Sequence, residues 1–197
     1  KRGYLIMREI LISTMGPILY IMAVLDAVAI GKMFACYKEK KTDKIPLLTG
    51  ILCIGLFYDA LILALGTVLP FGGLLKTLSQ FRYILHLVLI PRLFPICAYS
   101  LKLNRKWIKV IWVISLVIMI IGLIAGFSIV TEERTVGIIR RYAQSDLTPK
   151  FADTVVQMLD IVPVFFMIGI GIYLIIRKKN PHMFLSGTCM LVFTLLG

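Results

Sequence analysis

The sequence FRYILHLVLIPRLFPICAYSL, residues 81–101, decides how this chain is interpreted. It is apolar enough to cross a lipid bilayer as a helix, yet it contains Arg82, His86 and Arg92. A charged side chain at the centre of a bilayer costs about 2.5–3.5 kcal/mol on insertion scales, so such residues usually have a partner or face water. Their spacing places all three on roughly one side of a helix. We predict that this stretch is the functional helix of the chain.

Two prolines interrupt the same stretch after His86. Pro91 and Pro95 cannot donate a backbone hydrogen bond, and each would break the hydrogen-bond ladder of a continuous helix. Within a bilayer such breaks are tolerated only where a neighbouring group satisfies the backbone again. We therefore expect another element to pack against the helix at the prolines.

Composition places the chain among integral membrane proteins. Of its 197 residues, 59% are hydrophobic and 16% are charged, whereas a soluble domain has about 25% charged residues. The apolar segments predict an all-α fold, a polytopic transmembrane helix bundle that forms a single domain over residues 1–197. The predicted spans are residues 10–36, 45–69, 81–101, 110–130, 151–176 and 183–197. The sixth span is truncated and both ends look trimmed, so the complete chain could hold a seventh.

The net charge of +12 is explained by membrane anchoring. Most Lys and Arg residues lie in short clusters at the ends of apolar segments, which is how membrane proteins orient themselves. We therefore expect the lipid bilayer as a partner and no nucleic acid. The loops after spans one, three and five hold eleven Lys and Arg residues, against eight on the opposite side. We predict that these three loops face the cytoplasm and that the protein is a multi-pass protein of the plasma (inner) membrane.

The fourth predicted span carries no ionisable residue. Span 110–130 contains Ser115 and the small residues Gly122, Ala125 and Gly126, a spacing that permits close helix packing. We interpret this helix as scaffold. The polar segment 131–150 that follows is predicted to hold either a short interfacial helix at residues 136–142 or an ordinary solvated loop.

Metal and disulfide chemistry are not expected. The four cysteines lie in apolar segments without a CxxC pair, and the chain has only two histidines and no HExxH motif. No metal site is therefore predicted, and no motif identifies a cofactor or a catalytic residue. Whether the chain is an enzyme stays open at this point.

Polar residues in three spans are predicted to meet. Asp59 lies inside the second span, and Asp153, Gln157 and Asp160 form a polar stripe on one face of the fifth. With Arg82 and His86 they would line a cavity that opens to the outside. The predicted ligand or proton site is Asp59, Arg82, His86, Asp153, Gln157 and Asp160. Arg82 is expected near the mouth. The alternative is that these residues form purely structural ion pairs, for instance Arg82 with Asp153.

A secondary site is predicted in the cytoplasmic half of the membrane. Asp26 lies inside the first span, and Arg92 lies beyond the break at the first proline. The two side chains could pair with one another. A path for water or solute that continued from the outer cavity past them would favour transport.

These residues predict a protein that binds or transports a small solute or protons. Carboxylates at two depths together with a histidine can store or pass a proton. Arg82 could hold an anionic group, such as a carboxylate or a lipid phosphate. Two alternatives stay open. One is an intramembrane hydrolase or transferase that acts on lipid, with Asp59, His86 and Asp160 as acid–base groups. The other is a non-catalytic membrane subunit with a membrane-protein partner.

Overall fold

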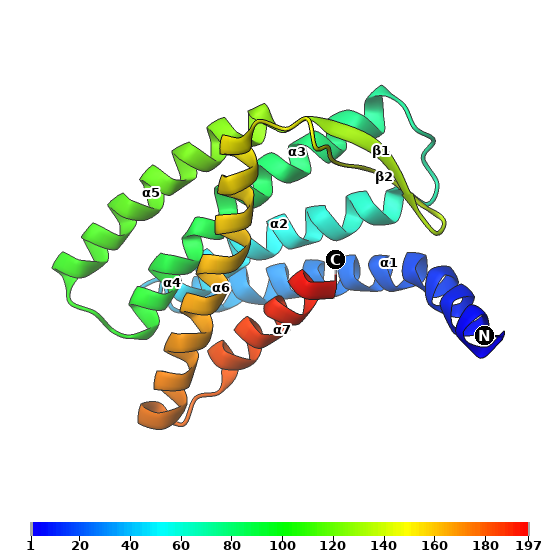
Figure 1. The fold of residues 1–197 in the computed structure, drawn as a ribbon. Helices are drawn as coiled ribbons and strands as arrows, with labels where there is room; N and C mark the ends of the chain where they lie inside the picture. Colours follow the sequence, from blue (N-terminus) through cyan, green and yellow to red (C-terminus); the bar gives the residue numbers. More distant parts are fainter. Residues whose placement is uncertain (1, 197) are drawn as a thin grey trace.

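The computed structural model describes residues 2–196, and it describes side chains from residue 15 to residue 191 (Figure 1). The chain is mostly helical, at 77%. Its elements are α1 (Arg2–Glu39), α2 (Ile45–Leu65), α3 (Gly73–Leu89), the 3-10 turn η1 (Ile90–Arg92), α4 (Leu93–Ser100), α5 (Arg105–Ser128), β1 (Thr131–Val136), β2 (Ile139–Gln144), α6 (Lys150–Lys178) and α7 (His182–Leu196).

Five helical segments are long and apolar enough to cross a membrane. They are Met15–Glu39, Ile45–Leu65, Gly73–Ser100, Arg105–Ser128 and Lys150–Lys178. Each overlaps a predicted span, and together they indicate a multi-pass membrane protein. The predicted sixth span corresponds to α7, whose 15 residues are fewer than the roughly 20 that a bilayer requires. A bundle of six spans therefore stays a prediction.

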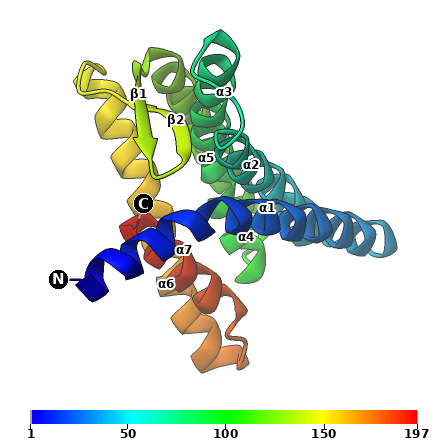
Figure 2. The same ribbon diagram turned by 90° about the vertical axis from the view of Figure 1, so that its right-hand side faces the viewer.

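The order in which the helices pack leaves α6 apart from the α1–α2 pair. α1 packs on α2, α2 on α3, α3 on α5, and α5 on α6, which pairs with α7. In Figures 1 and 2, α6 crosses the α1–α2 pair at a steep angle. α2 and α6 make at most marginal contact in the described part of the chain. Side chains that α2 and α3 direct toward α6 are therefore only partly covered.

The third span is broken at its prolines, and α5 compensates for the break. Pro95 has no N–H to donate to the carbonyl of Pro91, and the Ser115 hydroxyl of α5 donates to that carbonyl instead, at 2.9 Å. A Cβ at Gly122 would lie 2.6 Å from the carbonyl oxygen of Leu87, from which Pro91 removes the usual helical donor. These contacts confirm that a neighbouring element packs at the prolines, and they identify the element as α5.

The polar segment after α5 is an antiparallel hairpin, so the expected interfacial helix or loop is wrong. Thr131 pairs with Gln144 and Val136 with Ile139. Gly137, the first residue of the two-residue turn, has φ 62°, as a type II′ turn requires. A two-stranded hairpin is only marginally stable alone. This hairpin is held by its contacts with the helices.

The hairpin docks on α2 and α3. The main-chain N–H of Arg140 donates to the carbonyl of Gly66 at 2.9 Å, and a Cβ at Gly66 would collide with the carbonyl oxygen of Arg140. The N–H of Gln144 donates to the Tyr83 hydroxyl at 3.0 Å. The hairpin therefore lies against the end of α2 and against α3, as Figure 1 shows.

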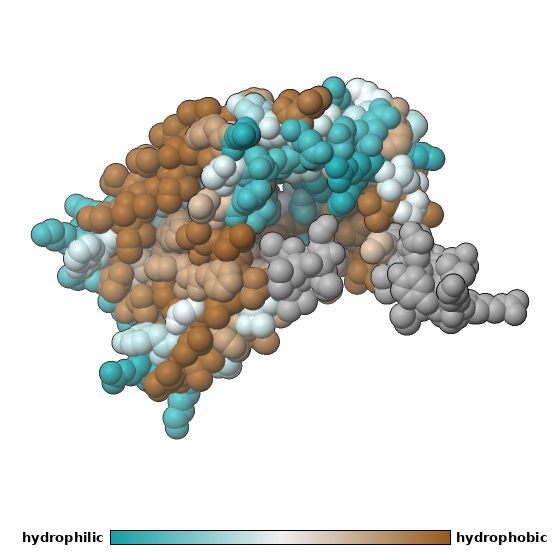
Figure 3. All heavy atoms as spheres, in the orientation of Figure 1, coloured by the Kyte–Doolittle hydropathy of each residue, from teal (hydrophilic) through white to brown (hydrophobic). Residues whose placement is uncertain are grey.

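The apolar surface is divided between a core and an outer face. The core cluster lies among α2, α3, α4, α5 and α6 and includes Leu48, Leu87, Ile96, Cys97 and Ala125. Large apolar side chains on the outside of α5 are exposed, which suits contact with lipid. In Figure 3 these apolar surfaces contrast with the hydrophilic surface around the hairpin.

Candidate functional site

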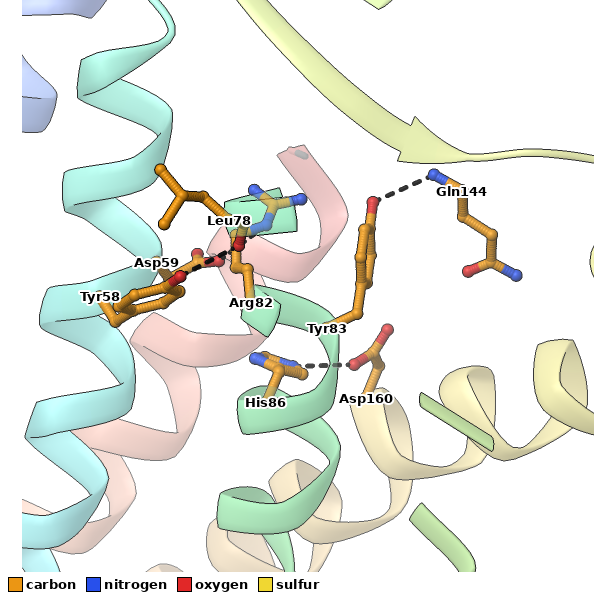
Figure 4. Close-up of polar contacts among 8 residues, drawn as sticks. All are labelled: Tyr58, Asp59, Leu78, Arg82, Tyr83, His86, Gln144 and Asp160. Carbon is orange, nitrogen blue, oxygen red and sulfur yellow. Dashed lines mark hydrogen bonds and ion pairs between the residues drawn. The ribbon is translucent and has the colours of Figure 1, made fainter. Parts of the chain in front are cut away.

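Arg82 on α3 forms an ion pair with Asp59 on α2. The distance from Nε of Arg82 to Oδ1 of Asp59 is 3.4 Å, and the guanidinium carbon lies 4.9 Å from the centre of the Tyr83 ring (Figure 4). The Arg82 side chain is 11% exposed, whereas that of Asp59 is 40% exposed. The expected pairing of Arg82 with Asp153 is therefore wrong, because α2 and not α6 presents its carboxylate to this side of α3.

His86, one turn further along α3, contacts Asp160 on α6. Its Nε2 lies 3.2 Å from Oδ1 of Asp160, and the dashed line in Figure 4 marks this contact. Both side chains are partly exposed, His86 at 41% and Asp160 at 33%. The contact is an ion pair when the imidazole is protonated and a hydrogen bond when Nε2 carries the proton of the neutral ring. It therefore joins α3 and α6 in either protonation state.

Asp153 is held in the first turn of α6 by two amides. Its Oδ2 accepts from Nε2 of Gln157 at 3.1 Å, and its Oδ1 accepts from Nε2 of Gln144 at 3.1 Å. A carboxylate at the start of a helix is also favoured by the helix dipole. Asp153 therefore fastens the hairpin to α6.

Together these six residues, which we call the polar cluster, form three neighbouring polar contacts. The polar cluster comprises Asp59, Arg82, His86, Asp153, Gln157 and Asp160. Arg82 and His86 are one turn apart on α3. Arg82 connects α3 to α2, and His86 connects α3 to α6. In the described part of the chain, no three His, Cys, Asp or Glu side chains gather as metal ligands.

The helix boundaries change the expected depth of Arg82. α3 begins at Gly73, eight residues before the predicted start of the third span. Arg82 therefore lies more than two turns from the start of its helix and not within one turn of it. Asp160 lies ten residues after Lys150, the first residue of α6, which is about 15 Å along a helix.

Partial exposure at this depth has a physical consequence. Ionisable groups of the polar cluster cannot face lipid tails without a cost of several kcal/mol. The exposed faces of Asp59, His86 and Asp160 must therefore meet water, a polar ligand or a polar group of another chain. Figure 3 shows hydrophilic surface over the hairpin and the start of α6.

Asp26 and Arg92 lie on separate elements, α1 and η1, and the secondary site stays a prediction. No ion pair joins their side chains, both of which lie in the part of the chain whose side chains are described. Asp26 lies on α1, which packs on α2, whereas Arg92 lies in η1 among α2, α5 and α6. α2, which contacts both α1 and η1, therefore lies between the two residues.

Two residues of the site were not predicted. Gln144 lies in a segment with no expected strand, and its amide contacts Asp153. Tyr83 stacks on Arg82 and accepts from the main chain of Gln144. Its position next to Arg82 was the only signal in the sequence. Nearby, Tyr58 donates to the Leu78 carbonyl at 3.1 Å and so fastens α2 to α3.

Fold and site define a class: a multi-pass membrane protein with ionisable residues held between its helices. No family model matches the sequence, and no curated protein or solved structure shows significant similarity to it. Any assignment of function therefore depends on the geometry of the polar cluster.

Proposed function

We propose that this protein binds a small cationic solute at the polar cluster and exchanges it for a proton through His86 and Asp160. The contact of 3.2 Å between these two side chains carries the proposal. Histidine is the side chain whose ordinary titration range includes neutral pH. Because both groups are partly exposed, protons can reach them from water.

The charges of the polar cluster favour a cation. It contains three carboxylates and one guanidinium, and its net charge is −2 with His86 neutral and −1 with His86 protonated. Arg82 is mostly covered, by Asp59 and by the ring of Tyr83, so it is poorly placed to bind an anion. The more exposed carboxylates of Asp59 and Asp160 can accept hydrogen bonds or hold a positive group. A proton on His86 would weaken the attraction for such a solute, so proton and solute would compete.

The exchange can be tested in proteoliposomes that enclose a pH-sensitive dye, with Na⁺, K⁺ and tetramethylammonium as probes. We expect at least one of these cations, added outside, to raise the internal pH. His86→Ala and Asp160→Asn should slow the response at least about tenfold, since a general acid–base group contributes about 10²–10⁴ to proton transfer. The matched control is His182→Ala, at the exposed start of α7. Wild-type rates in both site variants, or no response to any cation in the wild type, would refute the proposal.

A histidine beside a carboxylate is also an acid–base pair, which supports a second candidate, a lipid-directed hydrolase or transferase. That reaction needs a nucleophile or an activated water next to His86, and the Asp160 carboxylate is the hydrogen-bond partner of His86 in the described structure. Incubation of the protein with phospholipid vesicles, followed by mass spectrometry of the lipids, separates the two candidates. New lipid products that disappear with His86→Ala would favour the enzyme.

A further inference from the structure

A second polar site lies at the opposite end of the molecule from the hairpin. A pocket of about 270 Å³ lies between the loop that joins α1 to α2 and the end of α4. Its polar lining comprises Lys40, Thr42, Asp43, Lys44, Tyr99 and Lys102. We call this the basic pocket. It shares no residue with the polar cluster.

The basic pocket is strongly positive. Lys40, Lys44 and Lys102 approach from two different loops, against a single carboxylate, Asp43. Oδ1 of Asp43 already accepts from the main-chain N–H of Ile45 at 3.0 Å, at the start of α2. This carboxylate is therefore already engaged at the start of α2, and one acid compensates the charge of three lysines only in part.

Several donors in the basic pocket remain available to a ligand. Nζ of Lys44 donates to the Tyr37 hydroxyl at 3.1 Å, and an ammonium group has three N–H donors. The Tyr99 hydroxyl accepts from Nε1 of Trp112 at 3.3 Å, so its own proton can be donated elsewhere. Ammonium and hydroxyl donors that converge in this way suit the acceptor oxygens of a phosphate group.

The basic pocket lies at the level where lipid headgroups are expected. Both tryptophans of the chain, Trp107 and Trp112, are on α5 within eight residues of its start, close to the pocket. Trp107 is 58% exposed. Tryptophan and lysine are enriched at the interface between membrane and water. Further along α5, Val113, Val117 and Ile120 are exposed and offer an apolar surface for acyl chains.

We infer that the basic pocket binds the headgroup of an anionic phospholipid. Its volume is slightly below the usual 300–1,000 Å³ of small-molecule sites, which suits a headgroup whose acyl chains remain in the bilayer. The charge pattern predicts that this end of the molecule faces the cytoplasm, where the membrane leaflet is rich in anionic lipid. A soluble phosphate shares the same chemistry, so the experiment must separate the two sources.

The test is native mass spectrometry of the purified protein in detergent, titrated with phosphatidylglycerol, with phosphatidylcholine and with glycerol phosphate. The pocket variant is Lys40→Gln/Lys44→Gln/Lys102→Gln. The matched control removes three charges at the same end but outside the pocket, Arg105→Gln/Lys106→Gln/Lys109→Gln. Circular dichroism establishes that both variants retain the helical content of the wild type, and a pocket variant that does not is replaced by Lys40→Gln/Lys102→Gln.

We expect one saturable phosphatidylglycerol on the wild type and weaker binding of phosphatidylcholine. The pocket variant should bind phosphatidylglycerol about 100-fold more weakly, because each basic residue near an anionic membrane surface contributes about fivefold. The control variant should stay within about threefold of the wild type. Equal losses in both variants, or equal affinity for the two lipids, would overturn the inference. Glycerol phosphate that bound as tightly as the lipid would assign the basic pocket to a soluble phosphate and would equally overturn it.

Discussion

The contact between Ser115 and the broken third span yields the sharpest stability prediction. Ser115 and Pro91 are both fully buried, and the Ser115 hydroxyl donates to the Pro91 carbonyl at 2.9 Å. Ser115→Ala removes this donor and leaves a small void. Hydrogen bonds between transmembrane helices are worth about 0.6 kcal/mol on average and about 1.7 at most. We expect a loss of stability near the upper value. Pro95 has no N–H to offer the Pro91 carbonyl, so this carbonyl has no donor within its own helix even when the helices are separated.

The assay follows the reaction of Cys97 with a thiol-specific dye during unfolding in sodium dodecyl sulfate. Cys97 is 1% exposed, so its labelling reports loss of packing. The other three cysteines, Cys36, Cys53 and Cys189, are first replaced by serine. The matched control is Ser128→Ala on the same helix, where the hydroxyl donates to the Ile124 carbonyl of its own helix. If Ser115→Ala costs no more than Ser128→Ala, within about 0.3 kcal/mol, the reasoning about the proline break is wrong.

Three further predictions concern the polar cluster and the hairpin. Arg82 is the more buried partner of its ion pair, so Asp59→Ala leaves a covered charge without its partner. In the same unfolding assay Asp59→Ala should cost about 1–3 kcal/mol of stability, and more than Arg82→Ala costs. Gly66→Ala should destabilise by about 1–3 kcal/mol and increase proteolysis of the hairpin, since a Cβ there meets the hairpin main chain. The hydrogen bond from Arg134 lowers the pKa of Glu132 from 4.5, so this contact should hold fully above about pH 4.5 and be lost as the pH falls through the lowered pKa. Carboxyl-carbon NMR titration should place the Glu132 value below 4.5 and show it rise in Arg134→Gln.

The expected and observed positions of Arg82 illustrate what a span boundary changes. The predicted start of the third span depended on where hydropathy rises, at Phe81. The helix itself begins at Gly73, since the more polar residues 73–80 are also helical. Arg82 and His86 keep their predicted spacing, since one turn separates them in any helix. Their distance from the start of the helix is longer than predicted, because the helix also includes residues that precede the apolar run.

The hairpin could not be predicted with the cues that located the helices. Its strands have only six residues each, and charged residues obscure the alternation that marks a strand. Gly137 was the one local signal of a turn. The hairpin is held by contacts with Gly66 and Tyr83, and neither contact can be inferred from the segment alone.

Local properties of the sequence determined the helical class, the five candidate spans and the residues of the polar cluster. Hydropathy, charge clusters and helical spacing belong to single segments, so they can be read without knowledge of the neighbours. Only the tertiary structure decided which polar groups meet. Arg82 pairs with Asp59 and not with Asp153, His86 meets Asp160, and Asp26 stays apart from Arg92. The reason is physical: pairing depends on how each helix is rotated and at what angle α6 crosses the others, and those angles result from packing along the whole length of the helices.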